Sequence, residues 1–73
     1  MTEYKVFEYD FIKNRGDNMQ IFNSFKEAKN EAYKIAKSFC EDEEPKFEKE
    51  QKNLWAYKTN CDFGSIIYRK GDQ

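Results

Sequence analysis

Two cysteines, Cys40 and Cys61, come closest to a chemical role among the side chains of this sequence. A cysteine acts as a nucleophile when a neighbouring base keeps it in the thiolate form. Histidine has the ordinary pKa that suits such proton transfer near neutral pH, and the sequence contains none. Cys40 falls on the apolar side of a predicted helix, and Cys61 falls in a predicted turn. We therefore expect no catalytic residues and a protein that is not an enzyme.

The same cysteines are not expected to bind a metal or to form a disulfide. The sequence has no CxxC pair and no Cys/His cluster of the kind that binds zinc. The N-terminal residues 1–4 lack the basic and then apolar pattern of a secretion signal, and no apolar run approaches the roughly 20 residues that cross a bilayer. We expect a cytoplasmic protein without membrane association. Thiols are kept reduced there, so free cysteines are predicted, with a disulfide as the alternative.

A run of four acidic residues is the second chemical feature. Carboxylates chelate hard cations, but this run lacks the spaced oxygen ligands and the glycine of a calcium loop. No metal, cofactor or small-molecule substrate is therefore expected. Two interpretations stay open: a solvated loop, or an acidic patch that meets a basic surface on a protein partner. The patch consists of Glu41, Asp42, Glu43 and Glu44.

Two tripeptides match known motifs but are better explained as turns. Arg15-Gly16-Asp17 spells a cell-adhesion sequence, and Asp62-Phe63-Gly64 spells a kinase triplet. The second lacks every companion motif of a kinase, and the chain is far too short for one.

Composition limits the chain to one domain and weighs against general binding to nucleic acids. The 73 residues are 38% hydrophobic and 37% charged, which is globular, and a chain this short forms a single core, so one domain over residues 1–73 is expected. Thirteen Lys and Arg oppose fourteen Asp and Glu, whereas nucleic-acid binders carry a basic excess. Local binding is kept as the alternative, through phosphate contacts of the helical lysines or base stacking on Trp55 and Tyr57. The lysines are Lys26, Lys34 and Lys37.

The elements that position these residues follow from the hydrophobic pattern. Aromatic and β-branched residues predict a strand over 4–13, a turn over 14–18 and a second strand over 19–22. Ser24 and Glu27 form a capping box, and apolar residues at three- and four-residue spacing continue the helix to residue 40 or 41. Strands are predicted over 46–51 (a polar edge strand), 54–59 and 65–70. The fold class is thus α+β: an antiparallel sheet of four to five strands, in the order β-β-α-β-β-β, with one amphipathic helix on one face.

Both faces of the predicted sheet carry apolar side chains, and one helix covers only one face. We expect the second face to stay partly exposed and to bind a protein, since contiguous exposed apolar surface commonly marks an interaction site. A strongly curled sheet that hides this surface is the alternative. The residues predicted for this face are Tyr4, Val6, Leu54 and Tyr68.

The sequence therefore predicts a small protein-binding module without enzymatic activity. Its partner is expected to be another protein or a second copy of the chain. Residues with AT-rich codons are abundant, which suggests a phage or mobile element and, within it, an inhibitor of a host defence protein of the anti-CRISPR kind. Binding of nucleic acids is the alternative.

Overall fold

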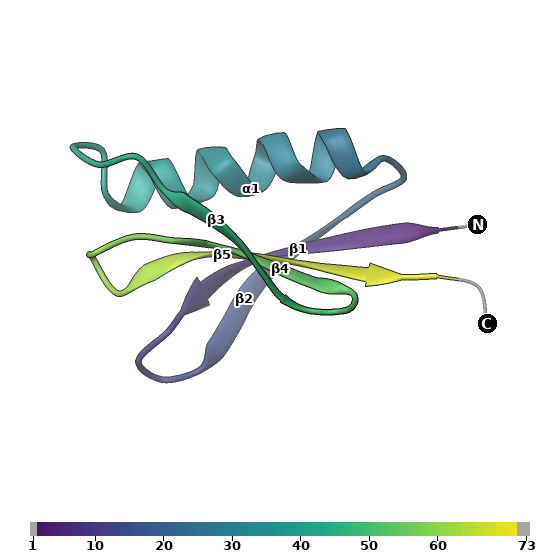
Figure 1. Cartoon of the computed structure of the whole chain (residues 1–73), viewed down its shortest axis with the longest axis horizontal. Helices are drawn as coiled ribbons and strands as arrows, with labels where there is room; N and C mark the ends of the chain where they lie inside the picture. The colour runs from purple at the N-terminus through teal and green to yellow at the C-terminus, as the bar shows by residue number, and fades with distance from the viewer. Residues whose placement is uncertain (1, 72–73) are drawn as a thin grey trace.

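The computed structural model describes residues 2–71 as five strands and one helix (Figure 1). The strands form one antiparallel sheet in the order β2-β1-β5-β4-β3, and the helix lies along one face, which confirms the predicted fold class. No helix within these residues is long and apolar enough to cross a membrane. The elements are β1 (Glu3–Asp10), β2 (Arg15–Phe22), α1 (Phe25–Phe39), β3 (Lys46–Gln51), β4 (Leu54–Lys58) and β5 (Phe63–Lys70).

The helix begins and ends where the sequence predicts. Ser24 has an extended backbone, and its side-chain oxygen accepts a hydrogen bond from the amide of Glu27 at 3.4 Å. This contact satisfies one of the free amides of the first turn. Cys40 is the residue that ends the helix. The capping residue and the apolar spacing are local signals, which explains why both boundaries are predictable.

The core lies between α1 and the three central strands. Ala28, Ala32 and Ala36 are buried on the helix, and their small side chains let it approach the sheet closely. Val6 of β1 and Ile67 of β5 face them from the sheet and are fully buried. A row of rings, Tyr4, Phe22, Phe25 and Trp55 among them, packs around this centre.

One polar side chain crosses the same interface. The hydroxyl of Ser65 on β5 is fully buried and donates to the carbonyl oxygen of Ala32 at 2.6 Å. Because a buried hydroxyl without a partner is costly, this bond fixes the position of the helix on the sheet.

The first hairpin turns earlier than predicted. The turn occupies residues 11–14, where the Asp10 carboxylate accepts from the amides of Ile12 and Lys13 at 2.9 and 3.1 Å. Arg15 and Gly16 therefore belong to β2 instead of the turn. The turn-favouring Asn18 has a φ of 55° inside β2, where the register with β1 shifts, so it forms a bulge.

The faces of β1 are opposite to the prediction. Val6 pairs with Ile67 and lies under the helix, and the Tyr4 ring packs against Phe25 at 5.5 Å between centroids. The expectation that Tyr4 and Val6 lie on the helix-free face is wrong. Both faces of β1 are apolar, so alternation alone does not tell which of them the helix covers.

The expectation of free cysteines is also wrong. A disulfide joins Cys40 to Cys61, with Cα atoms 5.9 Å apart, inside the roughly 4.4–6.8 Å range of disulfides. It connects the end of α1 to the turn between β4 and β5. The prediction of free cysteines rested on the reducing conditions of the cytoplasm. It did not include the fold, which brings the two residues together. The cytoplasmic location stays a prediction.

The edge strand over 46–51 is confirmed as β3. All six of its residues are exposed, and most are charged, which protects a sheet edge from unwanted pairing. Lys58 of β4 lies 3.5 Å from Glu48 and 3.0 Å from Glu50. The hydrogen bond to Glu50 is the main reason that the pKa of Lys58 is raised.

Candidate functional site

The face of the sheet that the helix leaves uncovered carries exposed apolar side chains. Side chains on neighbouring strands share a face when their residues are paired, so Ile21, Lys5, Tyr68 and Leu54 form one row across β2, β1, β5 and β4. Phe7, Ile66 and Ala56 form the next row. We call the apolar residues of this surface the open face: Phe7, Met19, Ile21, Leu54, Ile66 and Tyr68.

Exposure is concentrated at one side of this surface. Met19, Ile21 and Tyr68 keep 49%, 51% and 44% of their surface accessible. Leu54 and Ile66 are half-buried. The predicted residues Leu54 and Tyr68 thus lie on the open face, while Met19 and Ile21 were missed. Their alternation with Gln20 was visible in the sequence, but the neighbour across β1 that completes the row was not.

The other end of the same face covers itself. The rings of Tyr9 and Phe11 pack edge to face at 4.9 Å between centroids, and the ammonium of Lys58 lies 5.9 Å from the Phe11 centroid. Gly64 leaves space for the Phe11 ring, which a Cβ there would approach to 3.0 Å, and Gly16 leaves space for Phe7, whose Cβ it would approach to 3.3 Å. The exposed apolar surface that was expected on this face is therefore confined to the side of Met19, Ile21 and Tyr68.

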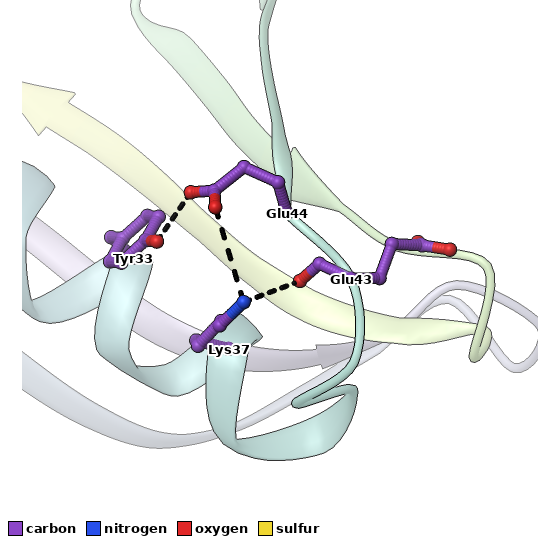
Figure 2. A network of polar contacts seen from close by, with 4 residues as sticks. All are labelled: Tyr33, Lys37, Glu43 and Glu44. Atoms are coloured by element: carbon purple, nitrogen blue, oxygen red, sulfur yellow. Dashed lines mark hydrogen bonds and ion pairs between the residues drawn. The ribbon is translucent and has the colours of Figure 1, made fainter.

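The acidic run is only partly available to a partner. Figure 2 shows Lys37 donating to the carbonyl oxygen of Glu43, at 3.0 Å, and lying 4.0 Å from the Glu44 carboxylate, which also accepts from the Tyr33 hydroxyl. The Glu43 carboxylate accepts from the backbone amide and the side-chain amide of Asn60. These contacts hold the loop against the helix and the β4–β5 turn.

The remaining two acidic residues, Glu41 and Asp42, are exposed at the end of the loop. The predicted acidic patch is therefore divided: Glu43 and Glu44 make hydrogen bonds within the chain, although 72% of the Glu44 side chain stays accessible, and Glu41 and Asp42 are exposed without such bonds among residues 2–71. The run of four was visible in the sequence, but the internal partners Tyr33, Lys37 and Asn60 were not.

Glu44 also changes the acid–base properties of two tyrosines. Its hydrogen bond, and then the loss of hydration, raise the pKa of Tyr33 above the ordinary 10.0. The pKa of Tyr57 is raised as well, mainly by burial and secondarily by the Glu44 charge. Because the folded-state pKa is the higher one, the contribution of these groups to stability is present below pH 10.0 and is lost as the pH rises through the folded-state pKa.

We predict that Glu44→Gln lowers the pKa of Tyr33 towards 10.0, because the neutral amide no longer favours the protonated phenol. The ultraviolet absorbance of phenolate during an alkaline titration measures it, and Tyr33→Phe identifies the residue that titrates. Glu43→Gln is the matched control, since its carboxylate bonds Asn60 instead of Tyr33. An unchanged Tyr33 titration in Glu44→Gln would contradict the assignment.

The basic helix face is weaker than the sequence indicates. Lys26 and Lys34 are exposed, but Lys37 is engaged by the acidic loop. The other proposed contact for nucleic acids, the aromatic pair of β4, faces the helix: Trp55 packs on Phe25 at 4.9 Å between centroids. Tyr57 is buried as well. Both rings thus belong to the packing between the helix and the sheet, with Trp55 half-buried. Binding of nucleic acids, through these rings or through the lysines, stays a prediction.

A cleft lies between the end of the helix and the first hairpin. It encloses about 210 Å³ and is lined by the stacked rings of Phe39 and Phe63 together with charged residues of both signs from β1, β2 and their turn. Among residues 2–71 no cluster of His, Cys, Asp and Glu has the arrangement to hold a metal ion.

Comparisons of the chain with protein-family models, with curated proteins and with solved structures return no match. We therefore infer function from the surfaces of this chain.

Proposed function

We propose that the protein is a non-enzymatic protein-binding module and that the open face is its contact surface. The observation that carries the proposal is the exposure of Met19, Ile21 and Tyr68 on the helix-free side of the sheet. Burial of apolar surface contributes about 25 cal/mol per Å², so covering three large side chains favours association. Aromatic residues and methionine are also enriched at interfaces.

The position of Lys5 indicates the chemistry of the partner. It pairs with Ile21 on one side and with Tyr68 on the other, so its cationic side chain lies inside the apolar surface. A carboxylate on the partner, surrounded by apolar side chains, would match it. A symmetric second copy placed over this row would bring two Lys5 side chains together, and like charges oppose that arrangement. A different protein is therefore the favoured partner, with self-association as the simpler variant.

The charged edge strand and the divided acidic loop support a secondary role for electrostatics. Glu41 and Asp42 are free to steer a basic partner, whereas Glu43 and Glu44 are engaged by hydrogen bonds to Asn60 and Tyr33. The narrower function expected from composition, inhibition of a host defence protein by a phage-encoded regulator, is a proposal within this one.

We predict that Ile21→Glu weakens partner binding at least tenfold while the chain stays folded. Ile21 lies on an edge strand and is half exposed, so the substitution costs the fold little but places a charge in the interface. A photoreactive residue at position 68 would capture the partner, and titration calorimetry with the purified partner would measure the affinity. Light scattering on a sizing column would test self-association at the same time.

Ile12→Glu provides the matched control. Ile12 is 69% exposed and lies in the β1–β2 turn, outside the open face. The proposal requires that Ile12→Glu leave the affinity unchanged. Equal losses for both variants, or none for Ile21→Glu, would exclude the open face as the contact surface.

A further inference from the structure

Three contacts join the end of α1 and the following loop to the β4–β5 turn. The rings of Phe39 and Phe63 stack with centroids 5.4 Å apart, the disulfide joins Cys40 and Cys61, and the Glu43 carboxylate binds Asn60. We call this region, residues 39–45 and 59–63, the corner. Only one of the three contacts is covalent, and its partners are 21 residues apart in the chain.

The core does not depend on the corner for its packing. The fully buried side chains of Val6 and Ile67 lie under the middle of the helix, where Ala28, Ala32 and Ser65 surround them. The strand pairing between β1 and β5 extends along the whole of both strands, from Glu3–Lys70 to Asp10–Phe63 beside the corner. The amide of Phe11 also donates to the carbonyl oxygen of Asp62 at 3.1 Å, so backbone bonds hold this end of the sheet without the disulfide. Loosening the corner thus leaves the helix-on-sheet interface intact.

The disulfide is accessible to a thiol. Residue Cys61 is exposed and residue Cys40 is half-buried, so we expect an incoming thiolate to attack the Cys61 sulfur. Attack there forms a mixed disulfide and releases Cys40 as the leaving thiolate, which takes up a proton. The second thiol of a dithiol reductant then attacks the mixed disulfide and frees Cys61. In total the protein gains two electrons and two protons, and the dithiol is oxidised to its own disulfide.

We propose that the Cys40–Cys61 disulfide is a reversible redox latch on the corner. Oxidised, it holds the loop over residues 40–45 against the β4–β5 turn. Reduced, it lets this loop separate from Asn60, so that the Glu43 carboxylate becomes available together with Glu41 and Asp42. Disulfides in a reducing compartment are typically transient or redox-sensing, which is the behaviour that an exposed disulfide at the edge of an independent core permits. This inference does not depend on the proposed role of the open face.

Amide NMR spectra of the full chain, with and without a dithiol reductant, test the latch. We expect reduction to shift the amide signals of the corner, Asn60 and Glu43 in particular, while the signals of Val6 and Ile67 stay in place. Urea unfolding should show a folding equilibrium constant that is lower by roughly 300-fold in the reduced protein, because the open chain has more conformational freedom when unfolded. Reoxidation should restore the original spectrum.

The double variant Cys40→Ser, Cys61→Ser is the control. It should give the reduced spectrum at all times and ignore the reductant. Glu43→Gln, which weakens one non-covalent contact and keeps the disulfide, should shift the corner less than reduction does. Loss of the whole spectrum on reduction, or unfolding of the double variant, would show a structural staple instead of a latch. Corner signals that do not move on reduction would also overturn the proposal.

Discussion

Replacing Gly64 with alanine should destabilise the fold by about 3 kcal/mol, a large part of the stability of a chain this small. A Cβ at position 64 would lie 2.1 Å from the carbonyl oxygen of Tyr57 and 3.0 Å from the ring of Phe11. The ring can rotate, but the carbonyl belongs to the neighbouring strand. Relief of the clash thus requires β4 and β5 to separate where the turn begins. Thermal unfolding measured by circular dichroism should show a midpoint lower by about 15 °C.

Gly71→Ala is the matched control for this substitution. A Cβ there would meet its nearest neighbour, Arg69, at 3.9 Å, an ordinary contact distance. The two variants change the same residue type in the same way, so a difference between them isolates the contact with Tyr57. Equal midpoints would mean that the strands adjust more easily than the geometry indicates.

The second large effect is expected for Ile67→Ala, which should cost about 3–4 kcal/mol. Ile67 is fully buried at the centre of the sheet, between Val6 and Trp55 on the neighbouring strands and under the helix. Removing most of its side chain leaves a cavity that the surrounding strands and helix fill only in part. Urea unfolding of the variant measures the loss, and an unchanged slope would show that the compactness of both states is preserved.

The neighbouring residue offers a control of the same type. Ile66 lies on the opposite face and is half-buried, so Ile66→Ala should cost about 1 kcal/mol. If Ile66→Ala costs as much as Ile67→Ala or more, the assignment of the core to the face of the sheet that carries Ile67 would be wrong.

These two isoleucines illustrate what the sequence can and cannot predict. The helix is predictable because Ser24 and the apolar spacing act within a few residues of each other. That Ile66 and Ile67 point to opposite faces is predictable from alternation. The pairing of β1 with β5 sets which residues share a face, and the packing of the helix decides which face is covered. Both involve residues far apart in the chain, so Tyr4 and Val6 were assigned to the wrong side.

The candidate sites divide in the same way. Leu54 and Tyr68 were predicted for the helix-free face and lie there, because they alternate with residues of obvious core type. The disulfide and the bonds of Glu43 to Asn60 join segments that come together only in the folded chain. No local sequence pattern marks such contacts. The sequence of the acidic run is the same whether its carboxylates are solvated or hydrogen-bonded within the chain.

The order of the strands has a consequence for folding of the newly synthesised chain. β5 is the last described strand to be synthesised, yet it lies in the middle of the sheet, between β1 and β4, where Glu3 pairs with Lys70. The β1–β2 and β3–β4 hairpins are joined in the sheet only through β5, so without β5 one edge of each hairpin has no strand to pair with. Pairing between residues far apart in the chain slows folding, and until it forms the unpaired strand edges are prone to aggregation. The two hairpins can join into one sheet only after β5 has been synthesised and is available to pair with both.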